Sequence, residues 1–131
     1  MRVITSGKPW EGRMRYAPAV RVAPGSLIFT SGLVGRGADG KIVVGGMGAQ
    51  ARQAFANIRD VLEAGGASMS DVVKLSYYVT DMARWEEVAE ARAEFFAAPL
   101  PASATVEVVR LWDENCLVEI EAIAVVEQQE R

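Results

Sequence analysis

The acidic pair Glu119 and Glu121 interrupts an otherwise apolar segment that continues through Ile123 and Val125. The two glutamates are two residues apart, so on a β-strand both side chains point to the same side. A carboxylate that reaches a polar pocket can bind water or a substrate donor and act as a general base. The other interpretation is an exposed or paired position at a sheet edge, and the residue types alone leave both interpretations open.

Histidine is absent from the chain, and Cys116 is the only cysteine. Catalytic triads, Cys-His dyads and zinc sites built from His or Cys are therefore excluded. Cys116 stands at the start of an apolar segment without a candidate base, which favours a small buried side chain over a nucleophile. Any chemistry must use carboxylates, hydroxyls, amines, backbone groups and water, so we expect no metal and no cofactor.

Two glycine-rich segments match the patterns of anion-binding loops. Residues 35–40 read G-x-G-x-x-G, a pattern that binds dinucleotides only where it opens a helix. Here Asp39-Gly40 predicts a turn into the β-rich residues 42–44, so the match is coincidental. Residues 45–48 could offer backbone N–H groups to an anion at the start of a helix, but a flexible connection is the simpler interpretation.

The overall composition predicts one globular domain over residues 1–131, because 50% of the residues are hydrophobic and 24% are charged. The formal net charge is −3 and no basic cluster is present, so we expect no binding to nucleic acid. No apolar run is long enough to cross a bilayer, so we expect no membrane contact. A single cysteine cannot form an intrachain disulfide, which favours a cytoplasmic protein.

The elements that must position these residues follow from the hydrophobic pattern. Residues 18–34 contain two β-rich runs around the turn residues 23–26, which predicts a hairpin. Further strands are expected at residues 41–44, 72–80, 104–110 and 117–126. Apolar residues at three- and four-residue steps predict a helix from Met47 to the stop at Gly65-Gly66. A second helix begins near the N-cap Asp81 and ends before Pro99.

Two amphipathic helices can cover only one face of a mixed sheet of five or six strands, so the fold class is α+β with one open sheet face. Several residues that would lie on the open face are apolar. Self-association is the simplest way to remove that surface from water, so we expect a homo-oligomer.

Four segments form a recognisable combination when they are taken in order. These segments are Tyr16, residues 29–32, Gln50 with residues 57–58 and 65–66, and residues 106–108 leading to 118–124. The combination of the Ser-Gly strand end with the V-E-I-E-A-I-A ending is specific, although each piece alone is weak. Together the segments resemble the YjgF/RidA family of reactive-intermediate deaminases, which are also labelled endoribonuclease L-PSP.

The resemblance implies a chorismate-mutase-like fold assembled as a homotrimer, with a small-molecule ligand in each cleft between subunits. The best-known branch of the family hydrolyses enamines and imines to 2-keto acids and ammonia. Carried over by position, Tyr16, Ser31, Gly32 and Glu119 are cleft residues, and Glu119 holds or activates the attacking water.

The chain departs from that branch where an arginine clamps the substrate carboxylate. The branch reads Pro-Ala-Arg-Ser, whereas this sequence has Ser103 at the arginine position and Ala89 where the second helix usually carries asparagine. Charge-assisted hydrogen bonds contribute about 1.5–3 kcal/mol each, so binding of a small 2-imino acid is expected to weaken roughly tenfold to a hundredfold. Loop arginines that could compensate are Arg13, Arg15 and Arg36.

Two functions remain open from the sequence. The first is a cleft enzyme acting on a neutral or differently charged enamine, imine or carbonyl compound, with Glu119 as the base that activates water and Tyr16 closing the pocket. In this hypothesis Ser31, Ser103 and Thr105 form hydrogen bonds to the substrate. The second is a non-catalytic trimer that binds or senses a small metabolite. A ribonuclease is the least consistent with the negative charge and the missing histidine.

Overall fold

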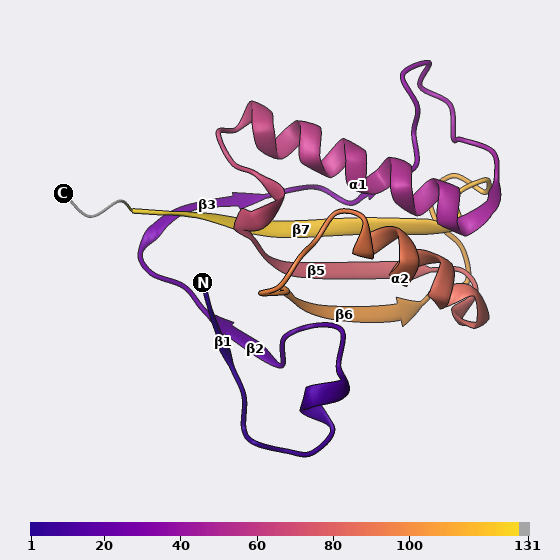
Figure 1. The fold of residues 1–131 in the computed structure, drawn as a ribbon. Coiled ribbons are helices and arrows are strands. Elements are labelled where there is room, and N and C mark those ends of the chain that lie inside the picture. Colours follow the sequence, from indigo (N-terminus) through magenta and orange to yellow (C-terminus); the bar gives the residue numbers. More distant parts are fainter. Residues whose placement is uncertain (129–131) are drawn as a thin grey trace.

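The structure is a computed structural model that describes residues 1–128, and its core consists of a mixed β-sheet with two helices (Figure 1). The main sheet has the hydrogen-bonded order β3-β7-β5-β6, and β4 pairs separately with β7. Only β5 and β6 run parallel. The strand bounds are β3 (Gly25–Phe29), β4 (Leu33–Val34), β5 (Val72–Val79), β6 (Ala102–Glu107) and β7 (Val118–Glu127). The predicted α+β class with a five-stranded sheet is therefore confirmed.

The predicted hairpin over residues 18–34 is wrong, because its two strands have different partners. β2 (Ala19–Arg21) pairs with β1 (Arg2–Ile4) in a separate two-stranded sheet, which projects beyond β6 in Figure 1. β3 pairs with β7, and a Cβ at Gly25 would collide with the backbone of Val126. Gly25 therefore allows a close approach of two strands and is not part of a hairpin turn.

The strand predicted at residues 41–44 is also absent from the described structure. Ile42 makes one isolated bridge to Arg36, and the chain turns at Gly40, whose φ is +80°. β4, which precedes this loop, pairs with β7 instead. The glycine-rich residues 35–40 thus lead into a loop and not into a helix, as their context predicted. Strand β6 begins two residues before and ends three residues before the predicted range of 104–110.

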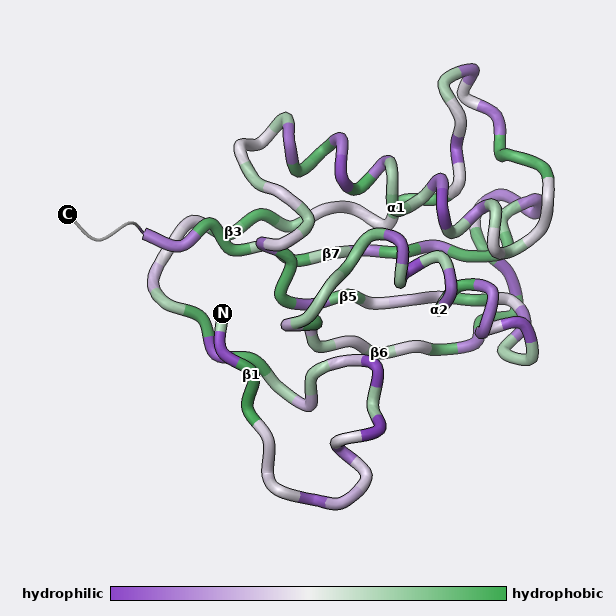
Figure 2. Tube along the Cα trace, in the orientation of Figure 1, coloured by the Kyte–Doolittle hydropathy of each residue, from purple (hydrophilic) through white to green (hydrophobic). Residues whose placement is uncertain are grey.

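Helix α1 (Gly46–Ala64) confirms the predicted amphipathic pattern. Its buried side chains recur at three- and four-residue steps, and hydrophilic and hydrophobic stretches alternate along its tube in Figure 2. The helix ends where Gly65 and Ala67 donate backbone hydrogen bonds to the last turn, and Gly66 adopts a φ of +82°. The buried members of this face are Met47, Gly48, Gln50, Ala51, Ala54, Phe55, Ile58 and Leu62.

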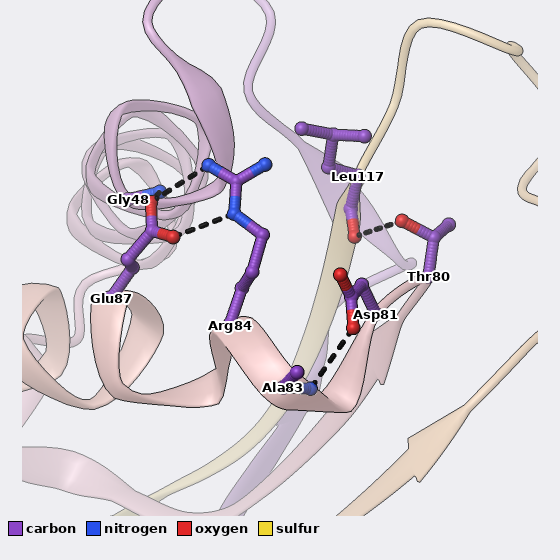
Figure 3. Close-up of polar contacts among 7 residues, drawn as sticks. All are labelled: Gly48, Thr80, Asp81, Ala83, Arg84, Glu87 and Leu117. Atoms are coloured by element: carbon purple, nitrogen blue, oxygen red, sulfur yellow. Dashed lines mark hydrogen bonds and ion pairs between the residues drawn. The ribbon is translucent and has the colours of Figure 1, made fainter.

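Helix α2 (Trp85–Ala93) follows the short 3-10 turns η2 (Met69–Asp71) and η3 (Met82–Arg84); a third, η1 (Glu11–Arg13), lies in the loop between β1 and β2. Asp81, predicted to cap the second helix, instead caps η3, which leads directly into α2: its carboxylate accepts a hydrogen bond from Ala83 N–H at 3.0 Å (Figure 3). No helix in the described part of the chain is long and apolar enough to cross a membrane.

The start of α1 is held by a carboxylate from α2. Glu87 accepts hydrogen bonds from the Gly48 N–H at 3.3 Å and from Arg84 Nε at 2.6 Å, as Figure 3 shows. Free N–H groups at a helix N-terminus favour a negative charge. Because Glu87 already supplies that charge, residues 45–48 connect and anchor the helix and do not form an open anion site.

The two faces of the main sheet differ in their cover. Alternate residues of β5 and β7, such as Tyr77 and Ile120, are buried beneath α1 and α2. The residues between them, such as Tyr78 and Glu119, lie on the opposite face, which no helix covers. On that open face Phe29 pairs with Ile123 and is 67% exposed.

Candidate functional site

The residues predicted for the site lie around two cavities of one subunit. One cavity of about 400 Å³, which we call the Ser103 cavity, is lined by Tyr16, Ser103 and Thr105 among others. A smaller one of about 240 Å³, the Glu119 cavity, is lined by Gly32 and Glu119. The predicted residues are thus brought together in two groups and not in one pocket.

Glu119 and Glu121 share the open face but have different surroundings. Glu121 accepts a hydrogen bond from the Tyr78 hydroxyl at 2.8 Å, and this interaction raises the pKa of Tyr78. Glu119 has no hydrogen bond or ion pair to any of residues 1–128, and its carboxyl group lies against Gly32. Of the two acids, Glu119 is therefore the one whose carboxylate is free to bind water or a ligand.

Two polar side chains of α1 position the segments around Glu119. Asn57 donates to the Val34 and Arg36 carbonyls at 3.0 and 2.9 Å, which fixes the chain after β4. The buried Gln50 donates to the Asn115 carbonyl at 2.9 Å and accepts from the Leu117 N–H at 2.8 Å, directly before β7. These amides explain why a polar residue occurs at position 50 within an apolar helix face.

The strand end at residues 29–32 is fixed to β7 by Thr30. The Thr30 hydroxyl donates to the Ser31 carbonyl at 2.8 Å and accepts from the Ala122 N–H at 2.9 Å. Gly32 follows at the wall of the Glu119 cavity. Ser31 is exposed and lines neither cavity in the isolated subunit.

The Ser103 cavity lies at the edge of the sheet, beside α2. Ser103 and Thr105 pair in register with Leu75 and Tyr77, so they share the helix-covered face. The segment before β2 is tied to the start of β6, because the Ala17 N–H donates to the Pro101 carbonyl at 3.1 Å. This backbone contact places Tyr16 beside the strand that carries Ser103.

The two halves of the site therefore occupy opposite faces of one sheet. Thr105 is aligned with Tyr77 on the covered face, whereas Glu119 is aligned with Tyr78 on the open face. Direct neighbours across a strand pair point to the same side, and successive residues point to opposite sides. A ligand cannot touch both Thr105 and Glu119 of the same subunit without passing through the sheet.

The three loop arginines divide between the cavities. Arg13 and Arg15 line the Ser103 cavity, and Arg15 also forms an exposed ion pair with Glu86. Arg36 lines the Glu119 cavity instead. The sequence reasoning missed a fourth arginine, Arg92 of α2, which is only 6% exposed and lines the Ser103 cavity.

Cys116 is buried at the wall of the Glu119 cavity. Burial and then the charge of Asp113 raise the pKa of its thiol, so the reactive thiolate is disfavoured. The thiol is therefore a poor nucleophile, which agrees with the prediction of a small buried side chain.

A family model, related sequences and solved structures all match this chain. The family model described as "Endoribonuclease L-PSP" matches residues 8–126. A protein of Dermatophagoides farinae named 2-iminobutanoate/2-iminopropanoate deaminase is 39% identical over 113 residues, which is 86% of each chain.

Two solved structures extend this likeness to the fold. A YjgF/YER057c/UK114 family member from Mycobacterium tuberculosis is 38% identical with a TM-score of 0.68, over 95% of this chain and 98% of that one. A Rid-family protein of unknown function from Yersinia pestis is 31% identical with a TM-score of 0.85, over the same shares of the two chains. Since the family model spans most of the sequence and the fold agrees, the chain belongs to the YjgF/RidA family.

Proposed function

We propose that this chain hydrolyses a small enamine, imine or activated carbonyl compound in a cleft shared by two subunits. The observation that carries the proposal is the Glu119 carboxylate, which has no partner within residues 1–128 and lies against Gly32 at a cavity wall. The printed activity of the mite relative, an imine deaminase, supports the same chemistry.

The proposed reaction needs one water molecule and no metal. Glu119 holds the water and accepts a proton as the oxygen attacks the carbon of the C=N bond, and the electron pair of that bond moves to nitrogen. Glu119 returns this proton to nitrogen, which gives an amino alcohol. The hydroxyl proton then passes through Glu119 to the amine, the C–N bond breaks with its electron pair going to nitrogen, and ammonia leaves as the O–H electron pair forms the C=O bond. The overall balance is one imine plus one water giving one carbonyl compound plus one ammonia.

A homotrimer supplies the missing half of each site in this proposal. Glu119 and the Ser103 cavity lie on opposite faces of one subunit, so a shared cleft must take Glu119 from one copy and Ser103 from the next. The exposed apolar residues of the open face, such as Leu27 and Phe29, supply surface for such an assembly. In the cleft Ser31, Ser103 and Thr105 donate hydrogen bonds, and Tyr16 closes the opening.

Ammonia release from freshly generated 2-iminopropanoate and 2-iminobutanoate tests the proposal. We expect release above the buffer rate, lowered at least a hundredfold in Glu119→Gln. The matched control is Glu121→Gln on the same strand face, which removes a carboxylate charge but keeps an oxygen that accepts from the Tyr78 hydroxyl, and it should leave most of the rate. Rates equal to buffer in the wild type, for both imino acids and for their neutral amides, contradict hydrolysis and leave the metabolite-binding trimer as the function.

A further inference from the structure

Arg92 is a buried cation that forms no ion pair within residues 1–128. Its side chain comes from the face of α2 that is turned toward the core, beside Val88 and Ala89, and it is more than nine-tenths buried. Its guanidinium lies 5.8 Å from the centroid of the Trp85 ring. Its buried polar neighbour among the described residues is the neutral Tyr77 hydroxyl, whose pKa burial raises and Arg92 lowers. Arg84 of η3, which is partly exposed, is by contrast neutralised by Glu87.

Burial of an unpaired charge is costly, so such a group indicates a partner that joins it from outside the subunit. The Ser103 cavity offers the space for one, because Arg92, Ser103 and Thr105 all line its wall. Tyr77, the register neighbour of Thr105, places a buried hydroxyl near the Arg92 guanidinium, and no well-formed hydrogen bond within the described residues satisfies it.

The charge around this cavity is positive although the chain as a whole is acidic. Arg13 also lines it, whereas Arg15 is committed to Glu86 at the exposed rim. Glu and Asp are missing from the lining residues. A small anion that enters would therefore meet guanidinium and hydroxyl donors only, which is the donor set that binds carboxylates.

We propose that Arg92 binds the carboxylate of the substrate, and so supplies from α2 the positive charge that the strand lacks at position 103. Ser103 and Thr105 then act as hydroxyl donors to the same anion, and Trp85 holds the guanidinium plane in place. This inference rests on the proposed function and narrows its substrates to imines or enamines that carry a carboxylate. It reverses the expectation from Ser103 alone that such acids bind weakly.

The test compares binding of pyruvate and of pyruvamide by isothermal titration calorimetry. Both carry a ketone and have nearly the same shape, but only pyruvate is an anion, and neither requires turnover. We expect the wild type to bind pyruvate at least tenfold more tightly than pyruvamide. Arg92→Gln should abolish this preference, and adding Ser103→Arg to Arg92→Gln should restore it, because the charge returns from the neighbouring strand.

The matched control is Arg59→Gln, since Arg59 also lies over an aromatic ring, 5.5 Å from the centroid of Phe95, but outside the cavity. It should leave the preference unchanged. If Arg92→Gln does not fold, Arg92→Lys keeps the charge but loses the planar pair of donors, and it should bind pyruvate several-fold more weakly. Thermal unfolding of each variant shows whether Arg92→Gln is folded, and therefore whether Arg92→Gln or Arg92→Lys is compared with the wild type.

Equal affinity of the wild type for pyruvate and pyruvamide overturns the assignment of Arg92. A preference that survives in folded Arg92→Gln but disappears in Arg13→Gln overturns it as well, because the rim arginine then binds the anion. These outcomes are separable from failure of the proposed function. A carboxylate preference without ammonia release contradicts the deaminase, whereas ammonia release without the preference contradicts the role of Arg92.

Discussion

Gly32 lies so close to Glu119 that a Cβ atom at position 32 would stand 2.7 Å from the Glu119 carboxyl carbon. Real Cβ atoms are not found at that distance, so any larger residue at position 32 must displace the carboxyl group. The neighbour is the end of a flexible side chain and not backbone, so the displacement is cheap for the fold. The glycine therefore sets the position of the proposed base.

Gly32→Ala should separate activity from stability. We expect the rate of ammonia release to fall roughly tenfold to a hundredfold, because a shift of about 1 Å in a reacting group has an effect of that size. The thermal midpoint should change little. Gly12→Ala is the control, since nothing lies within 4 Å of a Cβ at position 12. A fully active Gly32→Ala protein would show that the Glu119 position does not matter to the reaction.

Gln50→Met should destabilise the chain through the segment that leads into β7. The thioether has nearly the size of the amide but cannot replace its hydrogen bonds to the Asn115 carbonyl and the Leu117 N–H. Leaving buried backbone groups unpaired costs about 1–3 kcal/mol each, so we expect a loss of that order in urea unfolding. Gln53→Met, which removes only a bond to the Asn57 side chain, should have a smaller effect.

Glu87 makes the junction of α1 and α2 sensitive to acid. The hydrogen bond from Arg84, together with that from the Gly48 N–H, lowers the pKa of Glu87 below its ordinary 4.5. A carboxylate with a lowered pKa in the folded state stabilises the protein above its ordinary pKa, and that contribution disappears as the pH falls through the lowered value.

The stability of the wild type and of Glu87→Gln, measured as a function of pH, checks this contribution of the Glu87 carboxylate. We expect the wild type to be the more stable protein at pH 7, and the difference to shrink as the pH falls below 4.5 and through the lowered pKa of Glu87. Glu90→Gln on the same helix is the control, because Glu90 has no ion pair within the described chain. A stability difference that persists unchanged in acid would mean that the Glu87 charge is not responsible.

Phe29→Asp should prevent assembly without unfolding the subunit. Phe29 is already 67% exposed on the open face, so a charged residue costs the isolated chain little, whereas in an apolar interface it would be buried without a partner. Light scattering should report a trimer for the wild type and a monomer for Phe29→Asp. Val61→Asp on the outer side of α1 should remain trimeric. A monomeric wild type at micromolar concentration contradicts the shared cleft.

Local signals in the sequence were sufficient for the helices and their ends. The spacing of Met47, Ala51, Phe55 and Ile58 defines one helical face, and Asp81 is a short-range cap, so neither depends on distant parts of the chain. Strand partners are different. The turn at residues 23–26 is visible, but the pairing of β3 with β7 depends on a segment about 100 residues away, and nothing local specifies it.

The site residues also divide into those that the sequence identified and those that only the structure identified. Gly32 and Glu119 were found through resemblance, and the structure adds the contact between them. The sequence reasoning missed Arg92, although the sequence carries a signal for it. Arg92 continues the helical spacing of the apolar residues Trp85 and Val88 on α2. A charged residue within an apolar helical stripe indicates either a buried ion pair or a ligand. Only the structure shows that Arg92 forms no ion pair with the described residues.

The location of Glu119 and Ser103 on opposite sides of one sheet has a genetic consequence. A chain with a defective base and a chain with a defective anion pocket would each be inactive alone. In the proposed trimer, a ring that mixes the two can place an intact base from one copy beside an intact pocket of its neighbour. The proposal therefore predicts complementation between inactive alleles, with a fraction of full activity recovered on co-expression.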